Sequence, residues 1–136
     1  MHALVVDDSR SMRSILGRIL KSIGVEVDEA ADGADALAQV DAGMVPDVAL
    51  VDWHMPAMNG VELVAELRQR PELEHMSIMM VTTEGEPEQI GVALEAGANE
   101  YLIKPFTADA VVQKLTLLGK WPLGHDTTDQ PKAGAQ

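Results

Sequence analysis

Short apolar runs alternate with segments of helical periodicity along most of this chain. Between Met12 and Ile23, apolar residues recur every three or four positions, as on one face of a helix, whereas Leu4-Val5-Val6 is continuously apolar, as in a strand buried on both faces. The pattern predicts strands at residues 3–6, 25–29, 48–51, 77–81 and 100–103, and helices at residues 12–23, 34–41, 60–69, 87–96 and 107–118. Every predicted strand is therefore followed by a helix.

Residues at the predicted helix ends agree with this division. Ser9 or Ser11 can cap the start of the first helix, and Gly24 can end it. Thr107 can cap the last helix, and Gly97 follows the fourth helix, where a glycine commonly ends a helix. The helix boundaries therefore carry signals of their own, independent of the apolar pattern.

Five successive strand–helix pairs predict an α/β fold built on one parallel sheet. Parallel strands need crossover connections, which are right-handed and place helices on both faces of the sheet. We expect a single doubly wound, five-stranded domain at residues 1–119. The pattern stops near residue 120, and the polar segment that follows contains Gly and Pro. We expect residues 120–136 to form a disordered tail, and a docking role for this tail is left open.

Composition narrows the classes of function. The chain has 136 residues and a formal net charge of −12, which disfavours nonspecific binding to nucleic acid or to anionic membranes. It has no Cys, which excludes thiolate chemistry. It also lacks a run of about 20 apolar residues and a basic start typical of a signal peptide. We expect a cytoplasmic protein that binds neither nucleic acid nor membrane.

Polar residues follow four of the predicted strands at the point where each strand ends. Asp7 and Asp8 follow the first strand, Asp52 the third, Thr82 the fourth and Lys104 the fifth. In open parallel sheets, sites form at this carboxyl edge. Three carboxylates, a hydroxyl and an ammonium at one edge predict a divalent-metal and phosphoryl-transfer site. Ligation by oxygen alone favours Mg²⁺, with Mn²⁺ as the second possibility.

Each polar group has an expected part in this chemistry. Asp7 and Asp8 point in opposite directions if they extend the strand, so one would bind the metal directly and the other through water. Without a cation the carboxylates repel one another by several kcal/mol at an effective dielectric constant of about 20. Lys104 can reach a phosphoryl oxygen, and Thr82 offers a hydroxyl donor to the same group. Pro105, after Lys104, is a candidate for a cis peptide bond.

Together these residues resemble a known family, the response-regulator receiver domains of two-component signalling. The resemblance rests on Asp7-Asp8, on Asp52 with Met55-Pro56 and Gly60, on Thr82 after Met80-Val81, and on Lys104-Pro105-Phe106. It covers about residues 2–119, and residues 52–56 and 101–106 are similar to those of the single-domain chemotaxis regulators. It implies a flavodoxin-like sheet with strand order 2-1-3-4-5 and five helices.

The resemblance also implies a phosphoacceptor and a metal site. Asp52 would accept a phosphoryl group from the phosphohistidine of a sensor histidine kinase or a phosphotransfer protein. Asp8, Asp52 and the main-chain carbonyl of His54 would hold Mg²⁺, and Asp7 would contact the ion through water. These roles are carried over position by position from the family's motif.

Three further residues would take part in converting phosphorylation into a signal. Lys104 would pair with the phosphoryl group, and Thr82 would move inward to form a hydrogen bond with it. Tyr101 would then turn from exposed to buried. This movement would alter the face formed by the fourth helix, the fifth strand and the fifth helix, where a downstream protein would bind.

Residues around the entrance of the site are expected to set the lifetime of the phosphoryl group. In the family these positions screen or orient water, and here they are His54, Thr83 and Glu84. We hypothesise that His54 and Glu84 shape autodephosphorylation. Trp53, next to Asp52, is expected to be partly exposed and to report metal and phosphoryl binding through its fluorescence.

We interpret the chain as a stand-alone, monomeric receiver that catalyses only its own phosphorylation and slow dephosphorylation. A receiver-like scaffold that works without phosphorylation is the main alternative. A magnesium-dependent aspartyl-phosphate phosphatase would need a second Asp two residues after the nucleophile, where His54 stands, and a lid insertion. A nucleotide or flavin binder would need a Gly-rich or hydroxyl-rich loop where Asp7 and Asp8 stand, and their charges repel phosphate.

Overall fold

A parallel sheet of five strands forms the centre of the protein, in a computed structural model that describes residues 1–83 and 85–120. The strands are β1 (His2–Val6), β2 (Glu26–Ala30), β3 (Val48–Asp52), β4 (Ser77–Thr82) and β5 (Glu100–Ile103). The helices are α1 (Arg10–Ser22), α2 (Gly33–Asp41), α3 (Gly60–Arg68), α4 (Pro87–Ala96) and α5 (Ala108–Leu117). A short 3-10 turn, η1 (Pro71–Leu73), was not expected. The strand order β2-β1-β3-β4-β5 confirms the predicted topology.

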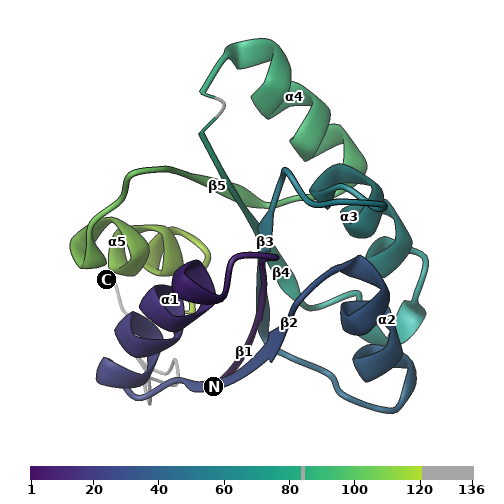
Figure 1. Cartoon of the computed structure of the whole chain (residues 1–136), viewed down its shortest axis with the longest axis horizontal. Coiled ribbons are helices and arrows are strands. Elements are labelled where there is room, and N and C mark those ends of the chain that lie inside the picture. Colours follow the sequence, from purple (N-terminus) through teal and green to yellow (C-terminus); the bar gives the residue numbers. More distant parts are fainter. Residues whose placement is uncertain (84, 121–136) are drawn as a thin grey trace.

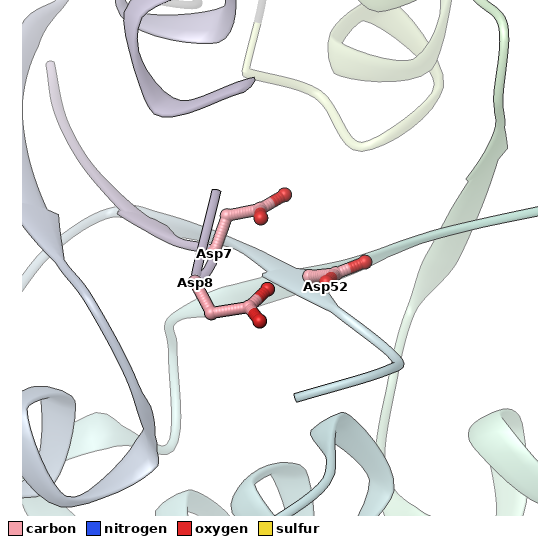
Figure 2. A group of neighbouring side chains, drawn as sticks. All are labelled: Asp7, Asp8 and Asp52. Carbon is pink, nitrogen blue, oxygen red and sulfur yellow. The ribbon is translucent and has the colours of Figure 1, made fainter. Parts of the chain in front are cut away.

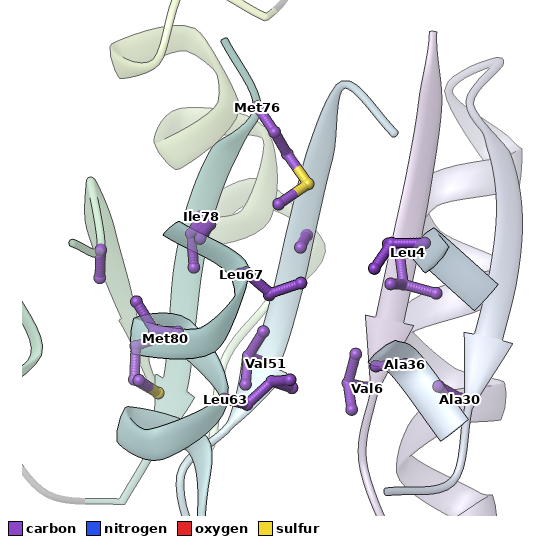
Figure 3. Packing of buried hydrophobic residues seen from close by; sticks show 14 of the residues in the cluster. Leu4, Val6, Ala30, Ala36, Val51, Leu63, Leu67, Met76, Ile78 and Met80 are labelled. Atoms are coloured by element: carbon purple, nitrogen blue, oxygen red, sulfur yellow. The ribbon is translucent and has the colours of Figure 1, made fainter. Parts of the chain in front are cut away.

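Helices cover both faces of the sheet (Figure 1). α1 and α5 lie on one face, and α2, α3 and α4 lie on the other. Neighbouring residues of a strand therefore enter different cores: Leu4 packs beneath α2, α3 and α4, and Val5 packs beneath α1 and α5. Figure 3 shows the first of these cores, where Leu63 and Leu67 of α3 lie over Val51 of β3. This two-sided burial explains the continuously apolar runs of the sequence.

Local capping fixes where the helices begin and end. The Ser9 hydroxyl accepts a hydrogen bond from the Met12 main-chain N–H at 3.2 Å, so Ser9 rather than Ser11 caps α1. Thr107 caps α5 in the same way. Gly97 ends α4 with φ at +121°, a backbone conformation that residues with a Cβ rarely adopt.

Strand register places the polar residues at one level of the sheet. Val6 of β1 pairs with Val51 of β3, so the residues that follow them, Asp7 and Asp52, lie side by side. On the other side of β3, Asp52 pairs with Val81 of β4. The residue after Val81 is therefore carried to the same edge as the two carboxylates. Main-chain pairing alone therefore brings these polar residues to the carboxyl edge of the sheet.

The end of β5 joins this edge through β4. Thr82 is the last residue of β4 and pairs with Ile103, and its carbonyl accepts a hydrogen bond from the Lys104 main-chain N–H at 2.7 Å. In residues 1–83 and 85–120, no helix is long and apolar enough to cross a membrane. Residues 121–136 lie outside the described part, so the expected tail stays a prediction.

Candidate functional site

Three carboxylates meet at the carboxyl edge of β1 and β3. Asp7, Asp8 and Asp52 each offer one oxygen, and these oxygens all lie within 4.8 Å of one another. Figure 2 shows the three side chains extending to the same side, Asp7 and Asp8 from the end of β1 and Asp52 from the end of β3. Asp7 and Asp52 are 1% and 5% exposed, whereas Asp8 is exposed. The predicted acidic cluster is therefore present, with two buried members and one open to solvent.

Lys104 provides the cationic partner of the two buried carboxylates. Its Nζ lies 3.0 Å from Asp52 Oδ1 and 3.6 Å from Asp7 Oδ2. The lysine follows β5, so its side chain reaches across the end of β4 to carboxylates on β1 and β3. The ammonium balances part of the charge of these carboxylates, and it is placed to contact any anionic group attached to Asp52.

The Asp7 carboxylate is held on one side and unsatisfied on the other. Its Oδ1 accepts a hydrogen bond from the Ser9 main-chain N–H at 2.8 Å, whereas the buried Oδ2 has no hydrogen-bond partner among the described residues. Burial raises the pKa of Asp7, an effect that the Ser9 hydrogen bond opposes and that the charge of Asp52 adds to. Asp7 Oδ2 thus has the Lys104 ammonium 3.6 Å away but no hydrogen bond from the described residues, which leaves it able to take a further positively charged partner.

These residues fit a hard divalent cation. The side-chain donors are all carboxylate oxygens, they converge from two neighbouring strand ends, and one buried oxygen is left for a further partner. Such a donor set suits Mg²⁺ or Mn²⁺ better than Zn²⁺, which prefers nitrogen and sulfur ligands. The ion itself and the expected ligation by the His54 carbonyl stay predictions.

The remaining site residues of β4 and the loop after it are placed as follows. Thr82 is buried at the end of β4, at the edge that carries Asp52, as expected. Thr83 is exposed beside it, and Glu84 lies outside the described residues. The peptide bond between Lys104 and Pro105 is cis. The structure thus brings Thr82 and Lys104 to the carboxylates, and the lifetime roles of Thr83 and Glu84 stay predictions.

Trp53 corrects one expectation. We expected a partly exposed ring, but only 9% of the residue is exposed and it belongs to the core beneath α2, α3 and α4. The reason is that the chain stays beside β4 after β3 ends: the Trp53 main-chain N–H donates to Val81 O at 3.1 Å. The exposed His54 ring stacks on the indole, with centroids 6.3 Å apart. Trp53 remains adjacent to Asp52, so it can still report changes at the site.

Tyr101 is half-buried in this structure, not exposed. Its ring packs against the edge of the core beneath α2, α3 and α4. The Nζ of Lys114, from α5, lies 4.4 Å from the ring centroid. Tyr101 pairs with Met80, two residues before Thr82 on β4, so the two residues with expected switching roles lie on neighbouring strands.

Sequence reasoning missed Arg13, which contacts the acidic loop directly. Its Nη1 donates to the main-chain carbonyl of Asp7 at 2.7 Å. A signal was available: Arg13 precedes the buried residues Leu16 and Leu20 by three and seven positions, which places it on the buried face of α1. An arginine on such a face needs an acceptor, and the acidic strand end was the nearest candidate.

Comparison with known proteins agrees with this geometry. The family model of the response regulator receiver domain matches residues 3–116. The chain is 41% identical over 119 residues to chemotaxis protein CheY1 of Helicobacter pylori, covering 87% of this chain and 96% of that protein. It is 43% identical over 116 residues to the chemotaxis protein CheY homolog of Campylobacter jejuni, covering 85% and 89%.

Solved structures give the same picture. The chemotaxis response regulator CheY4 of Vibrio cholerae superposes with a TM-score of 0.82 at 36% identity, over 86% of this chain and 97% of that one. A CheY-like response regulator receiver domain protein of Methanospirillum hungatei superposes with a TM-score of 0.77 at 30% identity, over 88% and 94%. The fold, the acidic edge and these relatives converge, and the chain belongs to the response-regulator receiver domain family.

Proposed function

We propose that this chain is a phosphorylation-controlled switch in two-component signalling and that Asp52 is its phosphoacceptor. One observation carries the proposal: Asp52 is a buried carboxylate at the carboxyl edge of the sheet, with an ammonium 3.0 Å away and two further carboxylates beside it. Membership of the receiver family supports the same role. Because the relatives described above are chemotaxis proteins, a pathway of that kind is the first to test.

The phosphoryl donor in this proposal is the phosphohistidine of a sensor histidine kinase or a phosphotransfer protein. A carboxylate oxygen of Asp52 attacks phosphorus; the new O–P bond forms as the donor's P–N bond breaks, and the imidazole leaves with the bonding electrons. Lys104 moves from the Asp52 carboxylate to a phosphoryl oxygen, and the Thr82 hydroxyl donates a hydrogen bond to the same group. The chain thus catalyses its own modification and acts on no other substrate.

The acidic cluster prepares Asp52 for this attack. Asp8, Asp52 and the main-chain carbonyl of His54 would hold Mg²⁺, with Asp7 in contact through water, and the ion would supply positive charge that stabilises the transferring group. By holding a cation, Asp7 and Asp8 would let a dianionic donor approach this edge of the sheet, whose negative charges would otherwise repel the donor.

The output in this proposal is a change of the face formed by α4, β5 and α5. Inward movement of Thr82 toward the phosphoryl group leaves room for Tyr101, which lies on the neighbouring strand and is half-buried in this structure. A downstream protein that prefers one position of Tyr101 would then bind according to the phosphorylation state, since a partner shifts the equilibrium by its differential affinity for the two states.

The lifetime of the phosphoryl group is a second part of the proposal. The exposed His54 ring follows Asp52 by two residues and stacks on Trp53. We expect the double substitution His54→Ala with Glu84→Ala to change the autodephosphorylation rate, measured as the decay of phosphorylated protein after removal of the donor. An unchanged decay would assign the lifetime to other residues.

The experiment that tests the function is phosphorylation by a small donor. The protein is incubated with Mg²⁺ and acetyl phosphate, and its intact mass is measured for the wild type, for Asp52→Asn and for Asp109→Asn, an exposed acidic residue on α5 that serves as the matched control. A mass gain of one phosphoryl group that requires Mg²⁺, disappears in Asp52→Asn and persists in Asp109→Asn supports the proposal. Metal binding without any such mass gain would point to the phosphorylation-independent scaffold.

A further inference from the structure

Arg13 of α1 joins three parts of the protein beside the acidic cluster. Its Nη1 donates to the main-chain carbonyl of Asp7 at 2.7 Å, and its Nε donates to Glu29 Oε1, in β2, at 3.1 Å. The Arg13 side chain is only 16% exposed, so this bridge lies mostly out of solvent. One planar guanidinium therefore ties the loop after β1 to both a helix and the neighbouring strand.

The carbonyl that Arg13 contacts belongs to the peptide group that joins Asp7 to Asp8. Fixing the plane of this peptide group fixes the direction in which the chain continues into Asp8. Asp7 is held at two further points: its main-chain N–H donates to Ala30 O at 3.2 Å, and its Oδ1 accepts from the Ser9 N–H at 2.8 Å. The Arg13 contact is the one among these that acts between the two adjacent acidic residues.

The choice of acceptor also matters for the charge of the site. Arg13 binds a carbonyl and not a carboxylate of the cluster, so the Asp7 and Asp8 carboxylates stay available for a cation. Its own charge is partly balanced by Glu29. A lysine at this position would keep the charge but lose the planar fork that serves two acceptors in different directions.

We propose that Arg13 is a positioning residue for the divalent cation: it holds the peptide group between Asp7 and Asp8 so that both carboxylates converge with Asp52. This inference deepens the proposed function, on which it rests. It assigns to Arg13 an effect on metal affinity and none on the transfer of the phosphoryl group once the site is filled.

Loss of the Arg13 charge and loss of its positioning contact should change Mg²⁺ affinity in opposite directions. Removing a positive charge near a cation site strengthens cation binding, because a repulsive interaction is lost. Removing a contact that orients the ligands weakens it, and losses of about 10-fold are typical for groups that hold metal ligands in place. We expect Arg13→Gln to bind Mg²⁺ about 10-fold more weakly than the wild type. Arg10→Gln, the matched control, removes the same charge from an exposed position on the same helix and leaves Mg²⁺ affinity unchanged or slightly higher.

The experiment measures Mg²⁺ affinity by titration calorimetry and by the fluorescence of Trp53, in a background where Trp121 is Phe. Arg13→Lys is included because it keeps the charge, so any weaker binding must come from geometry. Unfolding by urea without Mg²⁺ shows that each variant is folded, and if Arg13→Gln is not, Arg13→Lys decides. Weaker binding in the Arg13 variants but not in Arg10→Gln supports the proposal. Unchanged or tighter binding, or equal weakening in Arg10→Gln, overturns it.

A second readout separates positioning from catalysis. At saturating Mg²⁺, acetyl phosphate should modify Arg13→Gln at the wild-type rate, whereas at limiting Mg²⁺ the variant should be slower. A rate that stays low at saturating Mg²⁺ would contradict a positioning role. The wild-type arm tests the proposed function separately: if the wild type binds Mg²⁺ but gains no phosphoryl mass, the function fails while the metal affinities still decide the role of Arg13.

Discussion

Lys114 lies over the aromatic ring of Tyr101, with its Nζ 4.4 Å from the ring centroid. The same ammonium donates to Glu100 Oε1 at 3.0 Å, and that oxygen also accepts a hydrogen bond from the Tyr101 main-chain N–H at 3.1 Å. A residue of α5 is thus bound to two adjacent residues of β5, and the Tyr101 ring cannot leave its position without losing contact with the ammonium. Contacts of this kind stabilise by about 0.5–2 kcal/mol.

We predict that Lys114→Met releases the Tyr101 ring, because methionine keeps most of the length of the side chain but removes the charge. A loss of about 1 kcal/mol corresponds to about a five-fold shift in the ring's population. Tyr101 is the only tyrosine of the chain, so NMR of protein with ¹³C-labelled tyrosine reports this ring alone. Lys114→Arg should keep the wild-type spectrum. Identical ring signals in wild type and Lys114→Met would contradict the prediction.

Asp7→Asn should stabilise the metal-free protein near neutral pH. In the wild type a buried carboxylate has an unsatisfied oxygen, and burial raises its folded-state pKa above the usual 3.8. The ionised form therefore destabilises the fold at pH values above the raised pKa, and this cost disappears as the pH falls through the raised pKa towards 3.8. We expect a gain of about 1 kcal/mol in the free energy of unfolding at neutral pH and none in acid.

Urea unfolding of wild type and Asp7→Asn at both pH values measures this difference, with and without Mg²⁺. Mg²⁺ should reverse the order at neutral pH, because an ion that binds only the folded state stabilises the wild type more than a variant with a weakened site. An Asp7→Asn variant that is less stable than the wild type without Mg²⁺ at neutral pH would show that Asp7 is not under the strain that its surroundings indicate.

Lys104→Met should destabilise the metal-free protein, in contrast to Asp7→Asn. The Lys104 side chain is 20% exposed, and its Nζ lies 3.6 Å from the buried Asp7 carboxylate and 3.0 Å from the buried Asp52 carboxylate. Its removal leaves two carboxylates without a compensating charge, which costs about 2–3 kcal/mol after allowance for the partial exposure of the lysine. Saturating Mg²⁺ should recover most of this loss. Lys21→Met, on the exposed surface of α1, is the control and should be nearly neutral.

Mg²⁺ affinity gives an independent check on Lys104. Because the ammonium competes with a cation for the same carboxylates, Lys104→Met should bind Mg²⁺ more tightly than the wild type while it accepts the phosphoryl group more slowly from acetyl phosphate. Equal or weaker Mg²⁺ binding in Lys104→Met would mean that the lysine does not compete for the carboxylates and that its charge acts only on the incoming phosphoryl group.

The parts of the site that could be predicted are those set by strand register. Apolar runs located the strands, parallel strands bring their carboxyl ends to one edge, and Asp7, Asp8 and Asp52 had therefore to meet. The helix cap at Thr107 was predictable for a similar reason, since a cap depends on only a few neighbouring residues, whereas the sequence left the cap of α1 open between Ser9 and Ser11.

The parts that could not be predicted depend on the path of the chain between elements. Trp53 is buried because the backbone stays beside β4 after β3 has ended, which no local pattern indicates. Ala57, in the loop that follows, has φ at +68°, a conformation that alanine rarely adopts and that composition does not reveal. The contact between Lys114 and Tyr101 joins residues that are separated in sequence but adjacent in the fold. Such contacts follow only once the helices are docked.

Gly60, the first residue of α3, packs closely against the main chain of Asp52 and Trp53. A Cβ on Gly60 would lie 2.3 Å from Asp52 O and 2.9 Å from Trp53 Cα, and the Gly60 N–H donates to Trp53 O at 2.7 Å. Gly60→Ala must therefore displace the end of β3 or the start of α3, at a cost of about 1–3 kcal/mol in the free energy of unfolding. The same displacement moves the phosphoacceptor, so phosphorylation by acetyl phosphate should slow in the fraction that remains folded.

The matched control for Gly60→Ala is Gly91→Ala, inside α4, where an added Cβ would meet no atom within 4 Å. There the substitution should stabilise the protein by up to about 1 kcal/mol, because alanine has the higher helix propensity, and phosphorylation should be unchanged. Urea unfolding and the rate of mass gain with acetyl phosphate measure both effects. If the two glycine variants shifted stability in the same direction, close packing against the Asp52 main chain would not be the reason for glycine at position 60.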